Sequence, residues 1–165
     1  FLSPRLLTIS RYFLTSVFIP DNIETLYIYD YAFQDCKSLQ NIDLSKAHIL
    51  GVYSFYGSGL ESIHLDNVDA IDQAAFFHCY SLHEVYIGEN CNTIERGAFF
   101  YCTSLEEIHI QAYNPPRLEN EDQYNRVFDT RYLKRIYIRE GTLSDYESEP
   151  EWQYLFDAGV QFIEE

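Results

Sequence analysis

A six-residue pattern that recurs along the chain constrains the fold more than any other feature. The pattern, L-x-x-[IV]-x-[IL], begins at Leu14, Leu39, Leu60, Leu82, Leu105 and Leu133. Successive starts lie 25, 21, 22, 23 and 28 residues apart. Self-similarity at such a period is the sequence signature of a repeat architecture, in which no unit can bury its apolar face alone. We therefore expect about six stacked units.

Other residues recur in the same frame. Each of the last five runs is preceded by a small residue followed by phenylalanine: Ala32-Phe33, Ser54-Phe55, Ala75-Phe76, Ala98-Phe99 and Val127-Phe128. Five residues before the first four of these phenylalanines stand Ile28, Leu50, Ile71 and Ile94. Cys36, Cys79 and Cys102 each precede a pattern leucine by three residues. The first unit, from Leu14, lacks the Ala-Phe and cysteine columns and is degenerate.

Within each run the anchors alternate with outward residues, as in a strand with one buried face. Stacked units place these strands in a parallel sheet over the phenylalanine and aliphatic columns, which predicts a repeat solenoid. The spacing is too short for a crossover helix of ordinary length, so we expect return paths of turn and extended chain, with at most one short helical turn near Ala-Phe. A β-sandwich gives no reason for fixed Ala-Phe and cysteine offsets, and a propeller blade needs about twice this period.

The unit Ala75–Ile87, AFFHCYSLHEVYI, resembles the BspA-like leucine-rich repeat, A-F-x-x-C-x-S-L-x-x-I-x-I. Units 75–94 and 98–110 match best and 32–50 matches well, whereas the unit that begins at Ser54 carries Gly57-Ser58-Gly59 in place of the cysteine segment. The resemblance covers about residues 14–140. It implies a right-handed α/β horseshoe, mostly β, with a parallel sheet on its concave face.

The end of the chain resembles the closing unit of such proteins, I-Y-V-P-x-G-S-x-x-x-Y followed by a short helix with a tryptophan and a last strand. Here it reads IYIREGTLSDY over 136–146, then Trp152, and Pro115-Pro116 resembles the double proline before that unit. Arg139 replaces the usual proline. We expect a repeat array over 1–140 and a C-terminal cap over 141–165, because terminal repeats must cover the apolar end.

The resemblance also implies a bacterial protein that is secreted or attached to the cell surface and binds proteins, host matrix components among them, without chemistry or a cofactor. Pro4, Arg5 and Arg11 interrupt the first twenty residues, and no cleavage-like tail follows, so we expect no signal peptide here and a chain that starts partway through a protein. A net charge of −15 disfavours nucleic acid and anionic membrane. No run of 18 apolar residues exists to insert into a bilayer.

Cysteine and histidine offer little chemistry in this frame. The cysteines fall in core columns, so we expect free, buried thiols rather than disulfides or a nucleophile. His64 and His109 lie two units apart, roughly 9–10 Å, too far for one metal ion. The acidic run Glu119, Glu121 and Asp122 lacks the alternating ligands of a calcium loop. The prediction is no metal, no cofactor and no enzyme.

The outward residues of the strands remain as candidates for binding. The row between the last two anchors is Phe18, Asp43, His64, Tyr86, His109 and Tyr137, and the flanking row is Ser16, Asn41, Ser62, Glu84, Glu107 and Arg135. From these rows we expect a protein-binding surface made of Phe18, His64, Tyr86, His109, Tyr137, Glu84, Glu107 and Arg135. Aromatic side chains are enriched in binding surfaces, but they also stabilise parallel strands by same-face stacking, and both interpretations stay open.

Three further hypotheses follow. Exposed aromatic rings also suit a carbohydrate-binding surface. The strand expected at Leu14–Ile19 would leave an open edge for self-association, in a structural or assembly segment. The irregular segment 111–127 is expected to be a tolerated surface loop rather than a binding edge.

Overall fold

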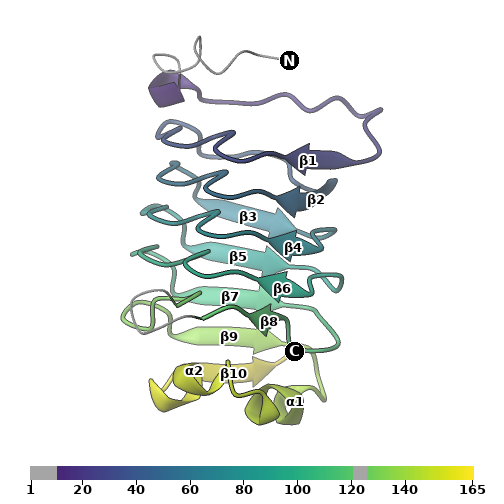
Figure 1. Cartoon of the computed structure of the whole chain (residues 1–165), viewed down its shortest axis with the longest axis vertical. Coiled ribbons are helices and arrows are strands. Elements are labelled where there is room, and N and C mark those ends of the chain that lie inside the picture. Colours follow the sequence, from purple (N-terminus) through teal and green to yellow (C-terminus); the bar gives the residue numbers. More distant parts are fainter. Residues whose placement is uncertain (1–10, 121–125) are drawn as a thin grey trace.

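The computed structural model describes residues 11–120 and 126–165, and these form a β-solenoid of stacked parallel strands (Figure 1). The first ten residues, with Pro4 and Arg5, and positions 121–125, with Glu121 and Asp122, lie outside the described part. Two sheets of five strands run along the coil, and the helices near the C-terminus lie at the opposite end from residues 11–28 (Figure 1). The predicted repeat solenoid is confirmed.

The first sheet contains the predicted strands of the later units. Its order is β10-β9-β7-β5-β3, with β3 at Ser62–Leu65, β5 at Glu84–Ile87, β7 at Glu107–Ile110, β9 at Arg135–Ile138 and β10 at Gln161–Glu164. All neighbours are parallel, and the register joins Ile63 to Val85, Val85 to Ile108 and Ile108 to Ile136. Equivalent repeat positions therefore stand side by side, as the sequence columns predicted.

The return paths form a second parallel sheet, where the sequence predicted turns and extended chain with at most one short helical turn. Its order is β1-β2-β4-β6-β8, with β1 at Leu26–Ile28, β2 at Ala47–Leu50, β4 at Ala70–Ile71, β6 at Thr93–Ile94 and β8 at Arg117–Leu118. The buried aliphatic column, from Ile28 to Leu118, lies in these short strands. Burial of one aliphatic residue per turn brings the backbones close enough to pair.

The Ala-Phe segments are turns rather than helical. Backbone φ is positive two residues before the phenylalanine, at Tyr31, Tyr53, Ala74 and Gly97, and two residues after it, at Asp35, Gly57, His78 and Tyr101. Backbone amides at Phe33, Phe55, Phe76 and Phe99 donate to carbonyls of the next turn, at Ser54, Ala75, Ala98 and Val127. These inter-turn bonds hold non-glycine residues in a left-handed conformation that costs about 1–2 kcal/mol each.

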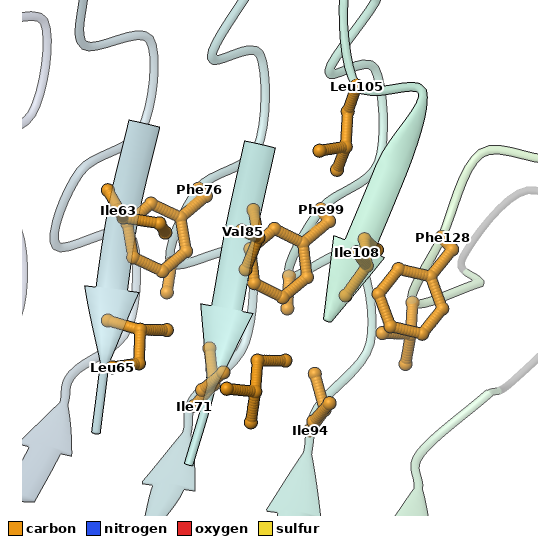
Figure 2. Packing of buried hydrophobic residues seen from close by; sticks show 14 of the residues in the cluster. Ile63, Leu65, Ile71, Phe76, Val85, Ile94, Phe99, Leu105, Ile108 and Phe128 are labelled. Atoms are coloured by element: carbon orange, nitrogen blue, oxygen red, sulfur yellow. The ribbon is translucent and has the colours of Figure 1, made fainter. Parts of the chain in front are cut away.

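A ladder of phenylalanine rings fills the centre of the coil. Phe33, Phe55, Phe76, Phe99 and Phe128 stack with ring centroids 5.1, 5.3, 5.2 and 5.6 Å apart. Figure 2 shows Phe76, Phe99 and Phe128 among the anchors of the first sheet and the aliphatic residues of the second. The ladder joins both sheets into one core.

The first two expected strands of the pattern are not formed. Residues 14–20 and 39–44 take no regular structure, although Leu39 and Leu44 are buried. Asp43 Oδ1 accepts a hydrogen bond from the Ser45 amide at 2.9 Å, which bends the chain just after the third anchor. The prediction of a strand at Leu14–Ile19 was therefore wrong, and the open strands at this end of the described residues are β1 and β3. Self-association stays a prediction.

Residues 141–165, where the sequence predicted a cap, contain α1 at Leu143–Ser148, α2 at Gln153–Asp157 and β10. Trp152 is fully buried just before α2, and its ring centroid lies 6.0 Å from that of Phe128 and 4.8 Å from that of Tyr146. The Trp152 ring thus continues the phenylalanine ladder. The two helices lie at this end of the stack (Figure 1). No helix of the described part is long and apolar enough to cross a membrane.

The described residues of the irregular segment, 111–120 and 126–127, contact both the coil and residues 141–165. Trp152 Nε1 donates to the Pro116 carbonyl at 2.9 Å, and Asn120 Nδ2 donates to the Glu151 carbonyl at 3.1 Å. Strand β8 lies within this segment and pairs with β6. Its described residues are thus more constrained than the expected surface loop.

The core ladder predicts a large stability loss on truncation. Phe76 is 0% exposed, and Phe76→Ala should lower the free energy of unfolding by about 3–5 kcal/mol, because it opens a cavity between two stacked rings. Urea denaturation followed by circular dichroism measures the change. Phe18→Ala is the control, since Phe18 is 86% exposed and its loss should change stability little. Equal effects of the two substitutions would contradict the ladder as the core.

Candidate functional site

The outward rows of the first sheet form a surface that we call the strand face. Along β5, β7 and β9 buried residues alternate with half-buried ones, so the anchors point inward and the residues between them outward. Because the strands share one register, each outward residue lies directly beside its counterpart in the next turn. The strand face is therefore a set of columns rather than a set of isolated residues.

Four of the predicted residues form one ring column on the strand face. His64, Tyr86, His109 and Tyr137 follow one another with ring centroids 4.3, 4.4 and 4.4 Å apart, and interplanar angles of 4°, 15° and 6°. His64 is exposed, whereas the other three rings are half-buried because their neighbours cover them. At the capped end, Ile163 of β10 pairs beside Tyr137. The column presents the edges of closely stacked rings to solvent.

The flanking column is charged. Tyr86 Oη donates to Glu84 Oε1 at 2.7 Å, and this hydrogen bond raises the pKa of the Tyr86 hydroxyl. In the next turns Arg135 forms an ion pair with Glu107, donating from both Nε and Nη2. Only one cation thus stands in this column beside two carboxylates.

A third carboxylate comes from the end of β10. Glu165 Oε1 lies 2.8 Å from His109 Nδ1 and accepts a hydrogen bond from Gln111 Nε2 at 3.2 Å. Glu165 thereby joins the last strand to the ring column across β9. With Glu84 and Glu107 it makes the strand face acidic along its middle.

Phe18 does not join the ring column. It lies in the segment 14–20, which pairs in no strand, and its side chain is 86% exposed. Asp43, the outward position of the next unit, also lies outside any strand. The structure thus brings together His64, Tyr86, His109 and Tyr137 with Glu84, Glu107 and Arg135, and leaves Phe18 apart from them.

The four cysteines lie buried inside the coil as thiols that form no disulfide, as the sequence predicted. Cys79 Sγ donates to the Phe55 carbonyl and Cys102 Sγ to the Phe76 carbonyl, each at 3.1 Å, so the thiols bond the turns together. Burial raises the pKa of Cys79 and of Cys91 to about 12, and raises that of Cys102 well above its usual value. Thiols held in this protonated state make poor nucleophiles.

Metal ligation has no site in the part of the chain that the structure describes. No three histidine, cysteine, aspartate or glutamate side chains among those residues gather closely enough to hold an ion. What the strand face offers is stacked rings, carboxylates and one arginine. Such groups recognise a partner by contact, hydrogen bonds and charge.

The buried thiols predict slow alkylation. At about pH 8 iodoacetamide should leave all four cysteines unmodified in the folded protein, because each is at most 2% exposed. At Cys79 and Cys91 a pKa of about 12 also keeps only about one thiol in ten thousand ionised. In urea all four should react. Mass spectrometry after a short incubation counts the adducts, and rapid modification of Cys79 or Cys102 in the folded protein would contradict their burial.

A second aromatic surface lies on the turns, and the sequence reasoning missed it. We call it the turn face: the outward residues of turns 31–35, 52–57, 73–78 and 96–101. Tyr31 and Tyr53 stack at 5.5 Å, and Tyr56 and Phe77 stack at 5.8 Å. The sequence signal for this surface was the recurrence of aromatic residues around each Ala-Phe or Ser-Phe pair. Gly57 and Gly59 stand where the neighbouring units carry side chains.

Comparison with known proteins identifies the repeat type. The family profile for the BspA type leucine rich repeat region matches the chain in six copies over residues 10–121. A crystal structure of a leucine-rich repeat protein from Bacteroides ovatus aligns with 73% of this chain and 48% of its own, at 15% identity and a TM-score of 0.35. No curated protein matches the chain significantly.

Proposed function

Because the chain belongs to the BspA type leucine-rich repeat family, whose fold is typically a non-enzymatic scaffold, we propose that it is a non-catalytic protein-binding module. Family membership confirms the resemblance seen in the sequence. As the finer part of the proposal, the module is bacterial, secreted or displayed at the cell surface, and contacts host or matrix proteins in the manner of an adhesin. The partner binds on the strand face.

The ring column carries the proposal. Its four rings are held at 4.3–4.4 Å spacing by the strands beneath them, so little side-chain freedom is left to lose on binding. Tyrosine is enriched among the residues that dominate binding energy, and rings packed into a rigid row suit this role. The stacking that stabilises the sheet also prepares the surface for a partner.

The charges favour a partner with basic side chains. Glu84, Glu107 and Glu165 lie beside the ring column with Arg135 as the cation among them. The chain as a whole carries a net charge of −15. Complementary charge speeds encounter and excludes acidic competitors, and its contribution falls as salt is added.

The chemistry of the strand face supports binding rather than catalysis. Glu107 is engaged by Arg135 and Glu84 by the Tyr86 hydroxyl, and the thiols are buried and protonated. A catalytic acid or base instead needs a group free to exchange a proton with a bound substrate. The same groups serve well as fixed points of contact.

A binding titration against purified extracellular-matrix proteins tests the proposal. Surface plasmon resonance should show at least one of them bound, with affinity that falls at high salt. The variant with His64, Tyr86, His109 and Tyr137 all changed to alanine should bind at least about ten times more weakly, because hot-spot rings each contribute 1 kcal/mol or more.

Tyr29→Ala provides the matched control, because Tyr29 is 78% exposed and lies outside the strand face. Its affinity should equal that of the unchanged protein. Far-ultraviolet circular dichroism checks that the fourfold variant keeps its sheets. Unreduced affinity of a folded fourfold variant, or no binding to any protein of the panel, would refute the proposal.

A further inference from the structure

A pocket beside the turn face lies where side chains are missing from two of the outward columns. Its volume is about 370 Å³, and it is lined by Asp35 and Lys37 from one turn, residues 56–59 from the next, and His78, Tyr80 and Ser81 from the third. A pocket of this size lies in the range of small-molecule sites. Its lining combines ring faces with several hydrogen-bonding groups.

The gap arises because the unit that begins at Ser54 carries glycine where the neighbouring units carry side chains. Two residues after each phenylalanine stand Asp35, Gly57, His78 and Tyr101, and four residues after it stand Lys37, Gly59, Tyr80 and Thr103. Gly57 and Gly59 thus remove one side chain from each of two adjacent columns. The pocket floor is the bare backbone of this turn.

The two glycines have different causes. At Gly59 an added Cβ would lie 2.1 Å from the Lys37 carbonyl oxygen, so the close approach of the backbones requires glycine. Gly57 has a φ of +63°, but Asp35, His78 and Tyr101 adopt nearly the same φ with full side chains. An added Cβ at Gly57 would meet only the Asp35 carboxylate, at 3.0 Å. The backbone therefore does not require glycine at position 57. The absence of a side chain there leaves an open space between the turns that carry Asp35 and His78, which we call the slot.

The walls of the slot stand two turns apart, about 9–10 Å from centre to centre. The Asp35 carboxylate reaches into this space, to 3.0 Å from the position of an added Gly57 Cβ, and the remaining pocket of about 370 Å³ has room for one six-membered ring. One wall carries the rings of His78 and Tyr80, which stack at 5.3 Å with an interplanar angle of 21°, and Tyr80 is 54% exposed. The other carries the Asp35 carboxylate and Lys37, whose ammonium also lies 5.4 Å from the Tyr12 ring.

The polar groups are arranged around this slot. Tyr56 Oη and His78 Nδ1 share a hydrogen bond at 3.1 Å, and burial lowers the pKa of His78, so its ring is neutral near neutral pH. A neutral imidazole and a phenol can each donate or accept. Asp35 adds an acceptor and Ser81 a hydroxyl. The slot thus offers aromatic rings on one side and a rim of donors and acceptors.

We propose that this slot binds a neutral pyranose, as a free sugar or as the end of a glycan. A pyranose has an apolar C–H face that packs on aromatic rings and a rim of hydroxyls that can both donate and accept. An aromatic side chain of a peptide would fill the ring position but leave the Asp35 carboxylate and the Ser81 hydroxyl without partners, which disfavours it. The site lies apart from the strand face and does not rest on the protein-binding proposal.

Saturation-transfer NMR with the methyl glycosides of glucose, galactose, mannose and N-acetylglucosamine tests the site. At least one glycoside at millimolar concentration should receive saturation at its ring C–H protons. Gly57→His puts a ring into the slot and should abolish the signal, and Tyr80→Ala removes the platform and should do the same.

Two controls match these variants. Gly57→Ala imposes the same left-handed backbone without a ring and should keep the signal, and Tyr29→Ala removes an exposed tyrosine outside the pocket. Circular dichroism checks each fold. Absence of transfer to every glycoside, or transfer that survives in folded Gly57→His and Tyr80→Ala, overturns the proposal. Neither result bears on the strand face.

Discussion

The spacing of successive turns, about 4.8 Å, governs everything else in this molecule. Each residue must tolerate its counterpart one turn away, as Phe33, Phe55, Phe76, Phe99 and Phe128 do by stacking at 5.1–5.6 Å. The backbone of the turns pairs at the same spacing, which stabilises left-handed residues that would otherwise be strained. Coil, core and surface therefore share one period, and the cap extends it through Trp152.

On the surface the same spacing works against like charges. Glu84 and Glu107 are direct neighbours in the sheet, an arrangement that costs free energy unless other groups compensate. The Tyr86 hydroxyl and Arg135 do so, one for each carboxylate. The ring column avoids the problem, because it alternates histidine with tyrosine and contains no carboxylate. The strand face is thus a compromise between stacking and charge.

The sequence predicted those parts of the fold that repeat with long patterns. The register of β3, β5, β7 and β9, the phenylalanine column and the buried thiols follow from three-column periodicity. The second sheet was not predicted, because strands of two residues such as Ala70–Ile71 leave no alternation to detect. The expected strand at 39–44 does not form. Asp43 Oδ1 accepts a hydrogen bond from the Ser45 amide there, and such local bonds compete with strand pairing. Four rings of the candidate site were placed correctly, since they share the register, whereas Phe18 was not.

Departures from the repeat are where a solenoid acquires individual properties. An inner position such as Phe76 is fixed by two neighbours and by both sheets, so a change there costs stability. An outward position is not enclosed between the two sheets. Gly57 shows the difference, because its turn keeps the backbone conformation of its neighbours while the absence of a side chain leaves a pocket. The core can therefore stay constant while single outward positions vary, which separates the stability of the coil from the specificity of its surfaces. The acidic strand face and the pocket at Gly57 are two surfaces that this separation allows on one coil.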